Sequence, residues 1–442
     1  MVHQFCARPH SGGMDSTERL IDLAIQTRLF SLSNCDGWAI ADEPFFVADL
    51  GQVIRQHRRW RVNLPDVLPF YGSAPIPPPS QVLASLVLTL IVGGCSANLG
   101  TGFDCASIEE LRTVLSLGVD PCRIIFANPC KSVSSLVFAA RTGVTRTTFD
   151  NLDELDNIRT FLPNAELVLR LYASDSDALI NLGEKFGATV EASLPLLQRA
   201  RELGAIVSQR IHELLSGTGA SNASAYVTAI RDAKIVFGYG KSLGFDMNLL
   251  DIGGGFQDSN LEDIACVLRP ILKEEFPGVR LLAEPGRYYV RSAYTLACKV
   301  LSRRRHSGTD HHDRPDMLYQ NDGVYGNFMN VLIEKETVRP SLVAYTWPFH
   351  SRGNDTRRKL EEHRYTIWGP TCDSMDCVAK DVPMTSEIRI GDWLKYKNMG
   401  ATATQFNGFS NQYDVIYINT ESMDHQVTHR KSVSKSIPGS LM

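Results

Sequence analysis

The segments NLLDIGGGF, residues 248–256, and VRLLAEPGRY, residues 279–288, are apolar strand-like runs that each end in residues suited to holding an anion. Three glycines end the first run, and without side chains their backbone N–H groups can approach a phosphate oxygen closely; they are Gly253, Gly254 and Gly255. Arg287 ends the second run and supplies a fixed fork of charged donors. A tight turn from strand to helix explains three glycines equally well, but the arginine on the next run favours a phosphate site.

Six further runs of the same kind precede these two, with amphipathic helical patterns between them. In chain order they are DVLPFY, GTGFDCA, RIIFANP, RTTFDN, ELVLRL and GAIVS. Strands that alternate with helices form parallel βαβ units, so eight of them predict a closed (β/α)8 TIM-type barrel that ends near Arg287. Active sites of such barrels lie at the carboxyl ends of the strands, and phosphate often binds after strands seven and eight. The two quoted segments occupy those two places.

The sequence pattern changes after Arg287 to β-branched and aromatic runs broken by turns, which indicates an antiparallel β domain. We therefore expect four parts: an N-terminal extension over 1–36, a barrel domain over 37–287 preceded by a strand that joins the sheet of the β domain, the β domain over 288–421, and a flexible tail over 422–442.

Composition and charge narrow the class of ligand. Hydrophobic residues make up 43% and charged residues 21% of the 442 residues, and the net charge of -4 argues against nucleic acid or an anionic membrane as partner. No apolar run approaches the roughly 20 residues needed to cross a bilayer. The ten cysteines form no credible metal site, and without a signal peptide they indicate reduced thiols in the cytoplasm. We expect a small-molecule ligand and no metal.

Glu284 ends the apolar run that also carries Arg287, three residues further on. A carboxylate buried there needs a cationic partner, and the pyridinium nitrogen of pyridoxal phosphate is one that would also explain the phosphate site. The alternative is an ion pair between Glu284 and Arg287 with a structural role alone.

Ten motifs in the same order make the chain resemble the ornithine decarboxylases, eukaryotic pyridoxal phosphate enzymes of the alanine racemase-like barrel fold. They are FFVADLGQV, GTGFDCAS, IIFANPCK, KFGA, LLDIGGGF, AEPGRYYV, NDGVYGNF, WGPTCDSMD, GDWLKYKNMGA and FNGF, within about residues 40–418. The resemblance implies decarboxylation of L-ornithine to putrescine in polyamine biosynthesis. It also implies a head-to-tail homodimer with active sites at the interface, and antizyme as a regulatory partner.

The resemblance further implies roles for individual residues. In the barrel, Glu284 would hold the pyridine nitrogen, the three glycines and Arg287 the phosphate, and Asp104 would lie beside the cofactor's reactive carbon. From the second subunit, Cys372 would return a proton after CO2 leaves, and Asp373 would bind the distal ammonium of the substrate. The interface would contain an ion pair of Lys185 with Asp376. Without the resemblance, the commoner interpretation of such a pair is a buried thiol at Cys372 and a turn residue at Asp373.

The chain departs from the family where the cofactor-linking lysine belongs. After PFY the family reads AVKCN, but this chain continues with Gly72, Ser73, Ala74 and Pro75 and has no lysine before Lys131. The segment 72–99 is also about ten residues too long, and its prolines cannot donate to a sheet. A translated intron or a misjoined exon explains such a segment better than point mutation. Lys131 lies at the same end of the barrel and is the candidate replacement for the cofactor-linking lysine. Its reach and angle would differ from those of a lysine on strand one.

Two further departures concern the cofactor ring and the substrate. The family's SFHVGSG corresponds to RIHELLSGTG here. Leu215 then takes the position of the family's ring-stacking histidine, and His212 is displaced from it by about a helical turn. Thr218 still offers a hydroxyl. The family's aromatic residue and aspartate after NDGVYG correspond to Ile333 and Glu334, and a tyrosine that contacts phosphate is Thr402 here.

Three functional states remain open from the sequence. The first is an ornithine decarboxylase whose natural form contains the lysine. The second is a catalytically inactive homologue that binds a regulatory partner, as antizyme inhibitors do. The third is a diverged decarboxylase of specialised amine or alkaloid metabolism, which Ile333 and Glu334 would suit.

Overall fold

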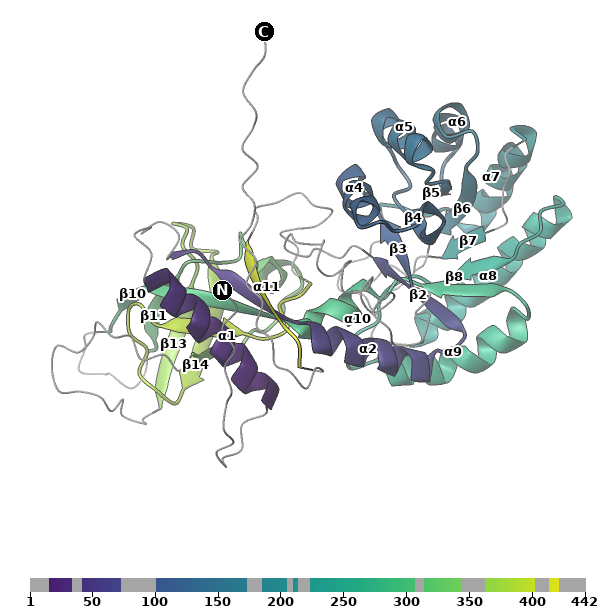
Figure 1. Ribbon diagram of the computed structural model, residues 1–442. Helices are drawn as coiled ribbons and strands as arrows, with labels where there is room; N and C mark the ends of the chain where they lie inside the picture. The colour runs from purple at the N-terminus through teal and green to yellow at the C-terminus, as the bar shows by residue number, and fades with distance from the viewer. Residues whose placement is uncertain are drawn as a thin grey trace, which may run out of the picture. The chain divides into compact units, whose positions relative to one another are not determined.

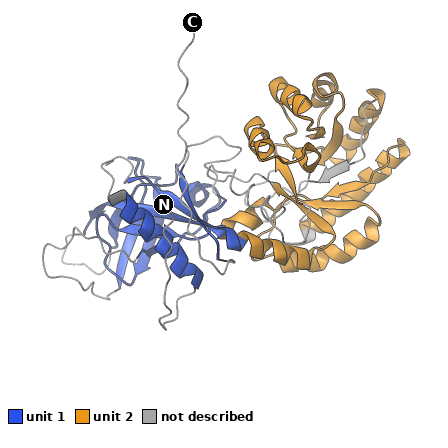
Figure 2. Cartoon of the chain, in the orientation of Figure 1, with its two compact units in different colours: residues 1–52, 293–404, 411–442 blue, residues 53–292, 405–410 orange. Residues whose placement is uncertain are grey.

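The computed structural model describes residues 16–33, 42–72, 101–172, 185–204, 210–213, 223–306, 314–343, 362–401 and 413–420. The chain forms two compact units (Figure 2). The unit that we call the barrel unit comprises 53–292 and 405–410, and the β unit comprises 1–52, 293–404 and 411–442.

The barrel unit contains a closed barrel of eight parallel strands (Figure 1). They follow one another around the barrel in chain order: β2 (Val67–Gly72), β3 (Gly102–Cys105), β4 (Ile124–Phe126), β5 (Arg146–Phe149), β6 (Glu166–Leu171), β7 (Arg210–Glu213), β8 (Leu249–Asp251) and β9 (Arg280–Ala283). Pairing of β2 with β9, with Val67 opposite Leu281, closes the barrel. The predicted fold class is confirmed.

Helix α2 precedes β2, and α4 to α10 follow β3 to β9 one after another, as in a (β/α)8 barrel (Figure 1). Their bounds are α2 (Leu50–Asn63), α4 (Ile108–Ser116), α5 (Val133–Thr142), α6 (Leu152–Phe161), α7 (Val190–Glu202), α8 (Ala223–Ser242), α9 (Leu261–Glu275) and the short α10 (Gly286–Val290). A capping box begins α4, because the Ser107 hydroxyl accepts from the Glu110 N–H while the Glu110 carboxylate accepts from the Ser107 N–H.

The sixth barrel strand lies further along the chain than the sequence pattern suggested. The run GAIVS covers 204–208, of which only Gly204 belongs to the described residues. The strand in this position is β7, which pairs with β6 on one side and β8 on the other. Because GAIVS is the more apolar of the two segments, periodicity alone favoured it.

Large apolar side chains fill the barrel interior. Phe70, Ile125, Leu249 and Leu282, from four different strands, form one buried cluster. Gly102 makes room for it, because a Cβ there would lie 2.2 Å from the Phe70 ring.

The β unit is built on an eight-stranded sheet. Its elements are β1 (Phe45–Asp49), β10 (Tyr294–Arg304), β11 (Asp316–Gln320), β12 (Pro340–Leu342), β13 (His363–Trp368), β14 (Cys377–Met384), β15 (Trp393–Tyr396) and β16 (Asp414–Ile418), with helices α1 (Ser16–Ser33) and α11 (Met329–Ile333). Most pairings are antiparallel, but β1 with β16 and β11 with β13 run parallel. Apolar side chains of α1 pack on the sheet, and Asp22 of α1 pairs with the buried Lys395.

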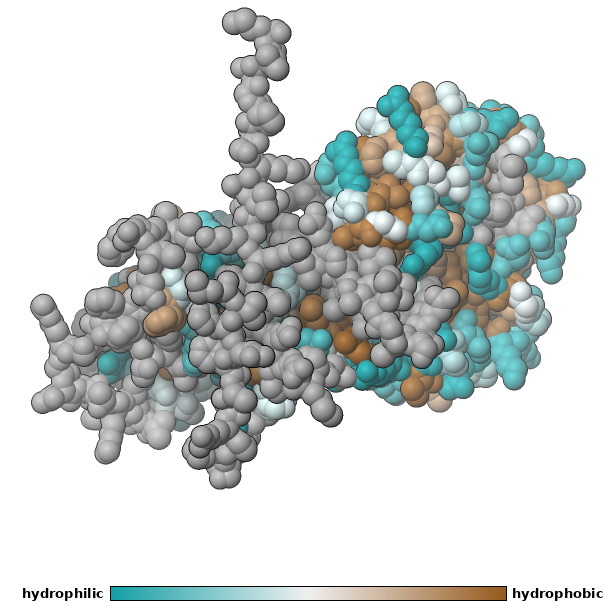
Figure 3. Space-filling model, in the orientation of Figure 1, coloured by the Kyte–Doolittle hydropathy of each residue, from teal (hydrophilic) through white to brown (hydrophobic). Residues whose placement is uncertain are grey.

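No helix in the described part of the chain is long and apolar enough to span a membrane. On the face shown in Figure 3, hydrophilic and hydrophobic residues are interspersed over the barrel unit.

Candidate active site

Four charged side chains meet at the carboxyl end of the barrel. Parallel strands in a closed barrel all end at the same side, so residues far apart in sequence converge there. Asp104 comes from β3, Arg170 from β6 and Asp251 from β8, while Glu284 directly follows β9. Arg170, Asp251 and Glu284 are buried, with 7%, 0% and 6% of their surfaces exposed.

Glu284 is the most perturbed of these groups. Burial raises its pKa to about 7, even though the positive charge of Arg170 and hydrogen bonds with Asp104 and Asp251 favour the ionised form. The buried site therefore keeps this carboxyl group protonated to higher pH than water does. A carboxyl group that keeps its proton can donate it to a basic ring nitrogen and remain beside that nitrogen as a carboxylate.

Arg170 is a site residue that the sequence reasoning missed. Burial lowers its pKa, and the negative charges of Glu284, Asp150 and Asp104 oppose that effect. Its guanidinium also stands 5.1 Å from the centre of the Phe186 ring. The available signal was an arginine between buried leucines near the carboxyl end of the strand ELVLRL.

The three glycines form a constrained loop after β8. Gly253 and Gly255 have positive φ angles of 71° and 87°, which side-chain-bearing residues rarely adopt. A Cβ on Gly254 would lie 3.2 Å from the Glu284 carbonyl oxygen. The Gly253 N–H donates to the Asp251 carboxylate at 2.9 Å, whereas within the described residues the N–H groups of Gly254 and Gly255 have no protein acceptor. These two donors suit an anion held from outside the chain.

Arg287 lies on α10, three residues beyond Glu284, and is half-buried. The loop after β8 and the segment after β9 are joined directly, because the Glu284 N–H donates to the Gly253 carbonyl at 2.7 Å. The residues predicted to hold phosphate and ring nitrogen are thus neighbours in the structure.

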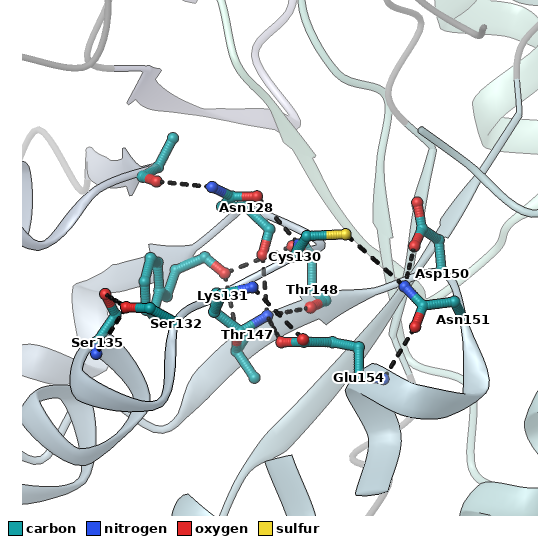
Figure 4. Close-up of polar contacts among 12 residues, drawn as sticks. Asn128, Cys130, Lys131, Ser132, Ser135, Thr147, Thr148, Asp150, Asn151 and Glu154 are labelled. Carbon is teal, nitrogen blue, oxygen red and sulfur yellow. Dashed lines mark hydrogen bonds and ion pairs between the residues drawn. The ribbon is translucent and has the colours of Figure 1, made fainter. Parts of the chain in front are cut away.

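Lys131 is held inside the loop that follows β4 (Figure 4). Its ammonium lies 2.7 Å from the Glu154 carboxylate and donates to the carbonyls of Thr148, at 2.7 Å, and Asn128, at 2.9 Å. The Lys131 side chain has 0% of its surface exposed, and burial lowers its pKa while Glu154 opposes that change. The ammonium thus makes two hydrogen bonds to backbone carbonyls and an ion pair with one carboxylate, so this amine joins a loop to β5 and α6.

The remaining lysines of residues 53–292 are Lys185, Lys234, Lys241 and Lys273. The last three lie on α8 and α9, and Lys185 is exposed, with its ammonium 5.0 Å from the Phe186 ring centre. The barrel unit therefore offers no lysine that matches the cofactor-linking lysine of strand one.

In the β unit, Cys372 and Asp373 are both exposed. The Asp373 carboxylate accepts from the Tyr325 hydroxyl and from the Met375 N–H at 2.9 Å, and the first of these bonds lowers its pKa. Glu334 is half-buried at the end of α11, next to Ile333, which is 46% exposed.

Asp376 is buried and is used within its own unit. Its carboxylate accepts from the N–H groups of Val324, at 2.8 Å, and Thr371, at 3.0 Å, and from the Thr371 hydroxyl at 2.7 Å. Its ion pair with Lys185 of a second copy stays a prediction.

The remaining predicted residues are only partly described. His212 belongs to β7, in register with Arg170 on one side and Asp251 on the other. Leu215, Thr218, Thr402 and most of the segment 72–99 lie outside the described residues. No cluster that could hold a metal ion occurs among the residues that the structure describes.

Residues 50–291 match the family described as "Pyridoxal-dependent decarboxylase, pyridoxal binding domain". The chain belongs to this decarboxylase family. It is 40% identical over 414 residues to an ornithine decarboxylase of Neurospora crassa, covering 86% of this chain and 81% of that one. Decarboxylase flvG of Aspergillus flavus is 41% identical over 387 residues, covering 86% and 87%. A solved arginine decarboxylase from Paramecium bursaria Chlorella virus, bound to agmatine, has a TM-score of 0.74 at 31% identity, covering 90% of this chain and all of that one.

The cofactor of this decarboxylase family is pyridoxal phosphate, and the non-covalent parts of the site fit it. The N–H groups of Gly254 and Gly255, which have no acceptor among the described residues, can donate to a phosphate, and the buried Glu284 suits a ring nitrogen. The covalent part does not fit, because the family's lysine motif is missing after β2 and Lys131 is engaged elsewhere.

We expect Lys131→Met to lower the free energy of unfolding by about 3–5 kcal/mol, because Glu154 would be left buried without its cation. The double variant Lys131→Met/Glu154→Gln should be more stable than the single one, because no charge remains buried. Urea unfolding measures both. A Lys131→Met protein as stable as the wild type would contradict the structural role of this lysine.

We expect Glu284 to make the free energy of unfolding fall as pH rises from about 4.5 to 7. Below this range the carboxyl group is protonated in both the folded and the unfolded chain. Within the range only the folded chain keeps the proton, and above it the carboxyl group is ionised in both. Relative to Glu284→Gln, the wild type should lose on the order of 3 kcal/mol across the range. Urea titrations at several pH values test this, with Glu109→Gln on the exposed face of α4 as control. Parallel pH profiles of wild type and Glu284→Gln would refute it.

Proposed function

We propose that this chain has the scaffold of an ornithine decarboxylase, which converts L-ornithine to putrescine and CO2 in polyamine biosynthesis. The observation that carries the proposal is the pairing, at one end of the barrel, of a buried glutamate with a glycine loop in which the N–H groups of Gly254 and Gly255 have no acceptor among the described residues. Similarity to an ornithine decarboxylase over 86% of the chain supports the choice of substrate.

Each residue would contribute a limited step. When bound, pyridoxal phosphate supplies an electron sink for the pair released as CO2 departs. Glu284 orients and charges the ring nitrogen, while Gly253, Gly254, Gly255 and Arg287 hold the phosphate. Asp104 lies beside them, on β3. From a second copy, Cys372 returns a proton to the carbon that lost CO2, and Asp373 binds the distal ammonium.

This chain lacks one part that the proposed reaction needs. Without a lysine after β2, it has no amine to exchange with the substrate and release the product, and positioning cannot replace a missing nucleophile. The buried ion pair of Lys131 with Glu154 argues against a substitute, because an ammonium paired with a carboxylate and bonded to two carbonyls is not a free base.

That observation favours, as a second candidate, an inactive homologue that binds a regulatory partner in the manner of an antizyme inhibitor. A third candidate is a decarboxylase of specialised amine or alkaloid metabolism acting on another amino acid. Glu334 next to the exposed Ile333 supports it, as does the similarity to Decarboxylase flvG.

The assembly and the location belong to the same proposal. We propose a head-to-tail homodimer with shared active sites, antizyme as a possible protein partner, and the cytoplasm as the compartment. Free thiols support the last point, because all seven cysteines of the described residues are unpaired with one another.

We expect no ornithine decarboxylation by the purified chain supplied with pyridoxal phosphate. In a variant with Ala-Val-Lys-Cys-Asn in place of residues 72–76, borohydride reduction should label the new lysine and activity should appear. Mass spectrometry and CO2 release are the readouts. Labelling of Lys131 in the wild type, together with turnover, would show that another lysine serves and that the chain is not impaired.

We expect a homodimer at micromolar concentration in which Lys185 pairs with Asp376 of a second copy, because an interface that buried either charge unpaired would be costly. Lys185→Ala should shift the equilibrium toward monomer, whereas Lys241→Ala, on α8, should not. Sedimentation velocity distinguishes the species. A wild-type chain that sediments only as monomer would refute the shared active site. Lys185 is the better residue to change, since replacing Asp376 would also break bonds inside the β unit.

A further inference from the structure

A tyrosine from α8 supports the glycine loop from behind. The Tyr226 hydroxyl donates to the Gly254 carbonyl at 2.7 Å. Its side chain is fully buried, and its ring centre lies 5.5 Å from that of Phe256, the residue that follows the loop. Neither the family motifs nor the predicted site included this residue.

Each of the three glycine carbonyls is held by a different donor. Gly253 accepts from the Glu284 N–H at 2.7 Å, Gly254 from Tyr226 at 2.7 Å, and Gly255 from the Asn260 amide at 3.3 Å. In a planar trans peptide, the carbonyl and the N–H of the next residue point in opposite directions. Holding the Gly254 carbonyl therefore fixes the direction of the Gly255 N–H, away from Tyr226.

We propose that Tyr226 is a positioning residue for phosphate binding, acting through the peptide between Gly254 and Gly255. The hydroxyl holds that peptide in the orientation that presents the Gly255 N–H to the anion. A hydrogen bond to the carbonyl also polarises the peptide and strengthens its N–H as a donor. The inference rests on the proposed function, because it assumes that the loop receives the phosphate of pyridoxal phosphate.

A role in packing alone is the competing explanation. A buried tyrosine hydroxyl needs a partner wherever it lies, and the nearest carbonyl would serve. The two explanations differ in what the hydroxyl affects. Packing depends on the ring, which phenylalanine retains, whereas the orientation of the peptide depends on the hydroxyl.

The test compares the wild type with Tyr226→Phe in equilibrium binding of three probes: pyridoxal phosphate, inorganic phosphate, and pyridoxal, which lacks the phosphate. We expect affinity for the two phosphate-bearing probes to fall about 3- to 10-fold, the effect of one hydrogen bond. Pyridoxal affinity should stay unchanged. Tyr239→Phe, a change of the same kind on the same helix, should alter none of the three. Thermal unfolding without ligand verifies that both variants are folded.

Two results would overturn the inference while leaving the proposed function intact. One is unchanged affinity of Tyr226→Phe for pyridoxal phosphate and for phosphate. The other is an equal loss of affinity for all three probes, which would indicate a general structural role. A wild-type chain that binds neither pyridoxal phosphate nor phosphate would instead reject the proposed function, and this inference with it.

Discussion

Closure of the parallel barrel is the constraint on which the candidate site depends. The pairing of Val67 with Leu281 joins the first strand to the last, and parallel direction then brings every strand's carboxyl end to one side. Asp104, Arg170 and Glu284 lie far apart in sequence and become neighbours only through this closure. The site is thus a consequence of topology more than of any single motif.

Two buried cations at that end of the barrel are used in different ways. Arg170 lies among carboxyl groups that raise the local negative charge, and its guanidinium cannot give up its proton in a protein. Lys131 could in principle act as a nucleophile, but its ammonium is enclosed by Glu154 and two backbone carbonyls. A buried charge pair of this kind is costly to break, so the fold itself restrains this lysine from taking a catalytic role.

The glycine loop illustrates how a scaffold prepares an anion site before any ligand binds. The segment after β9 holds one carbonyl through the Glu284 N–H, helix α8 holds the next through Tyr226, and the N-cap of α9 holds the third through Asn260. Three separate elements thus orient one short loop. Its N–H donors need little reorganisation when an anion arrives, which is the general advantage of preorganised donors.

The sequence by itself determined the class of fold, seven of the eight strand positions and the identity of the glycine loop with Glu284 and Arg287, because strand spacing and local motifs are properties of short segments. It also revealed the missing lysine. Only the tertiary structure decided the position of β7, the engagement of Lys131 with Glu154, and the parts played by Arg170 and Tyr226. These depend on which side chains from distant segments meet in a buried space, and burial sets their pKa values and hydrogen bonds. No local pattern contains that information.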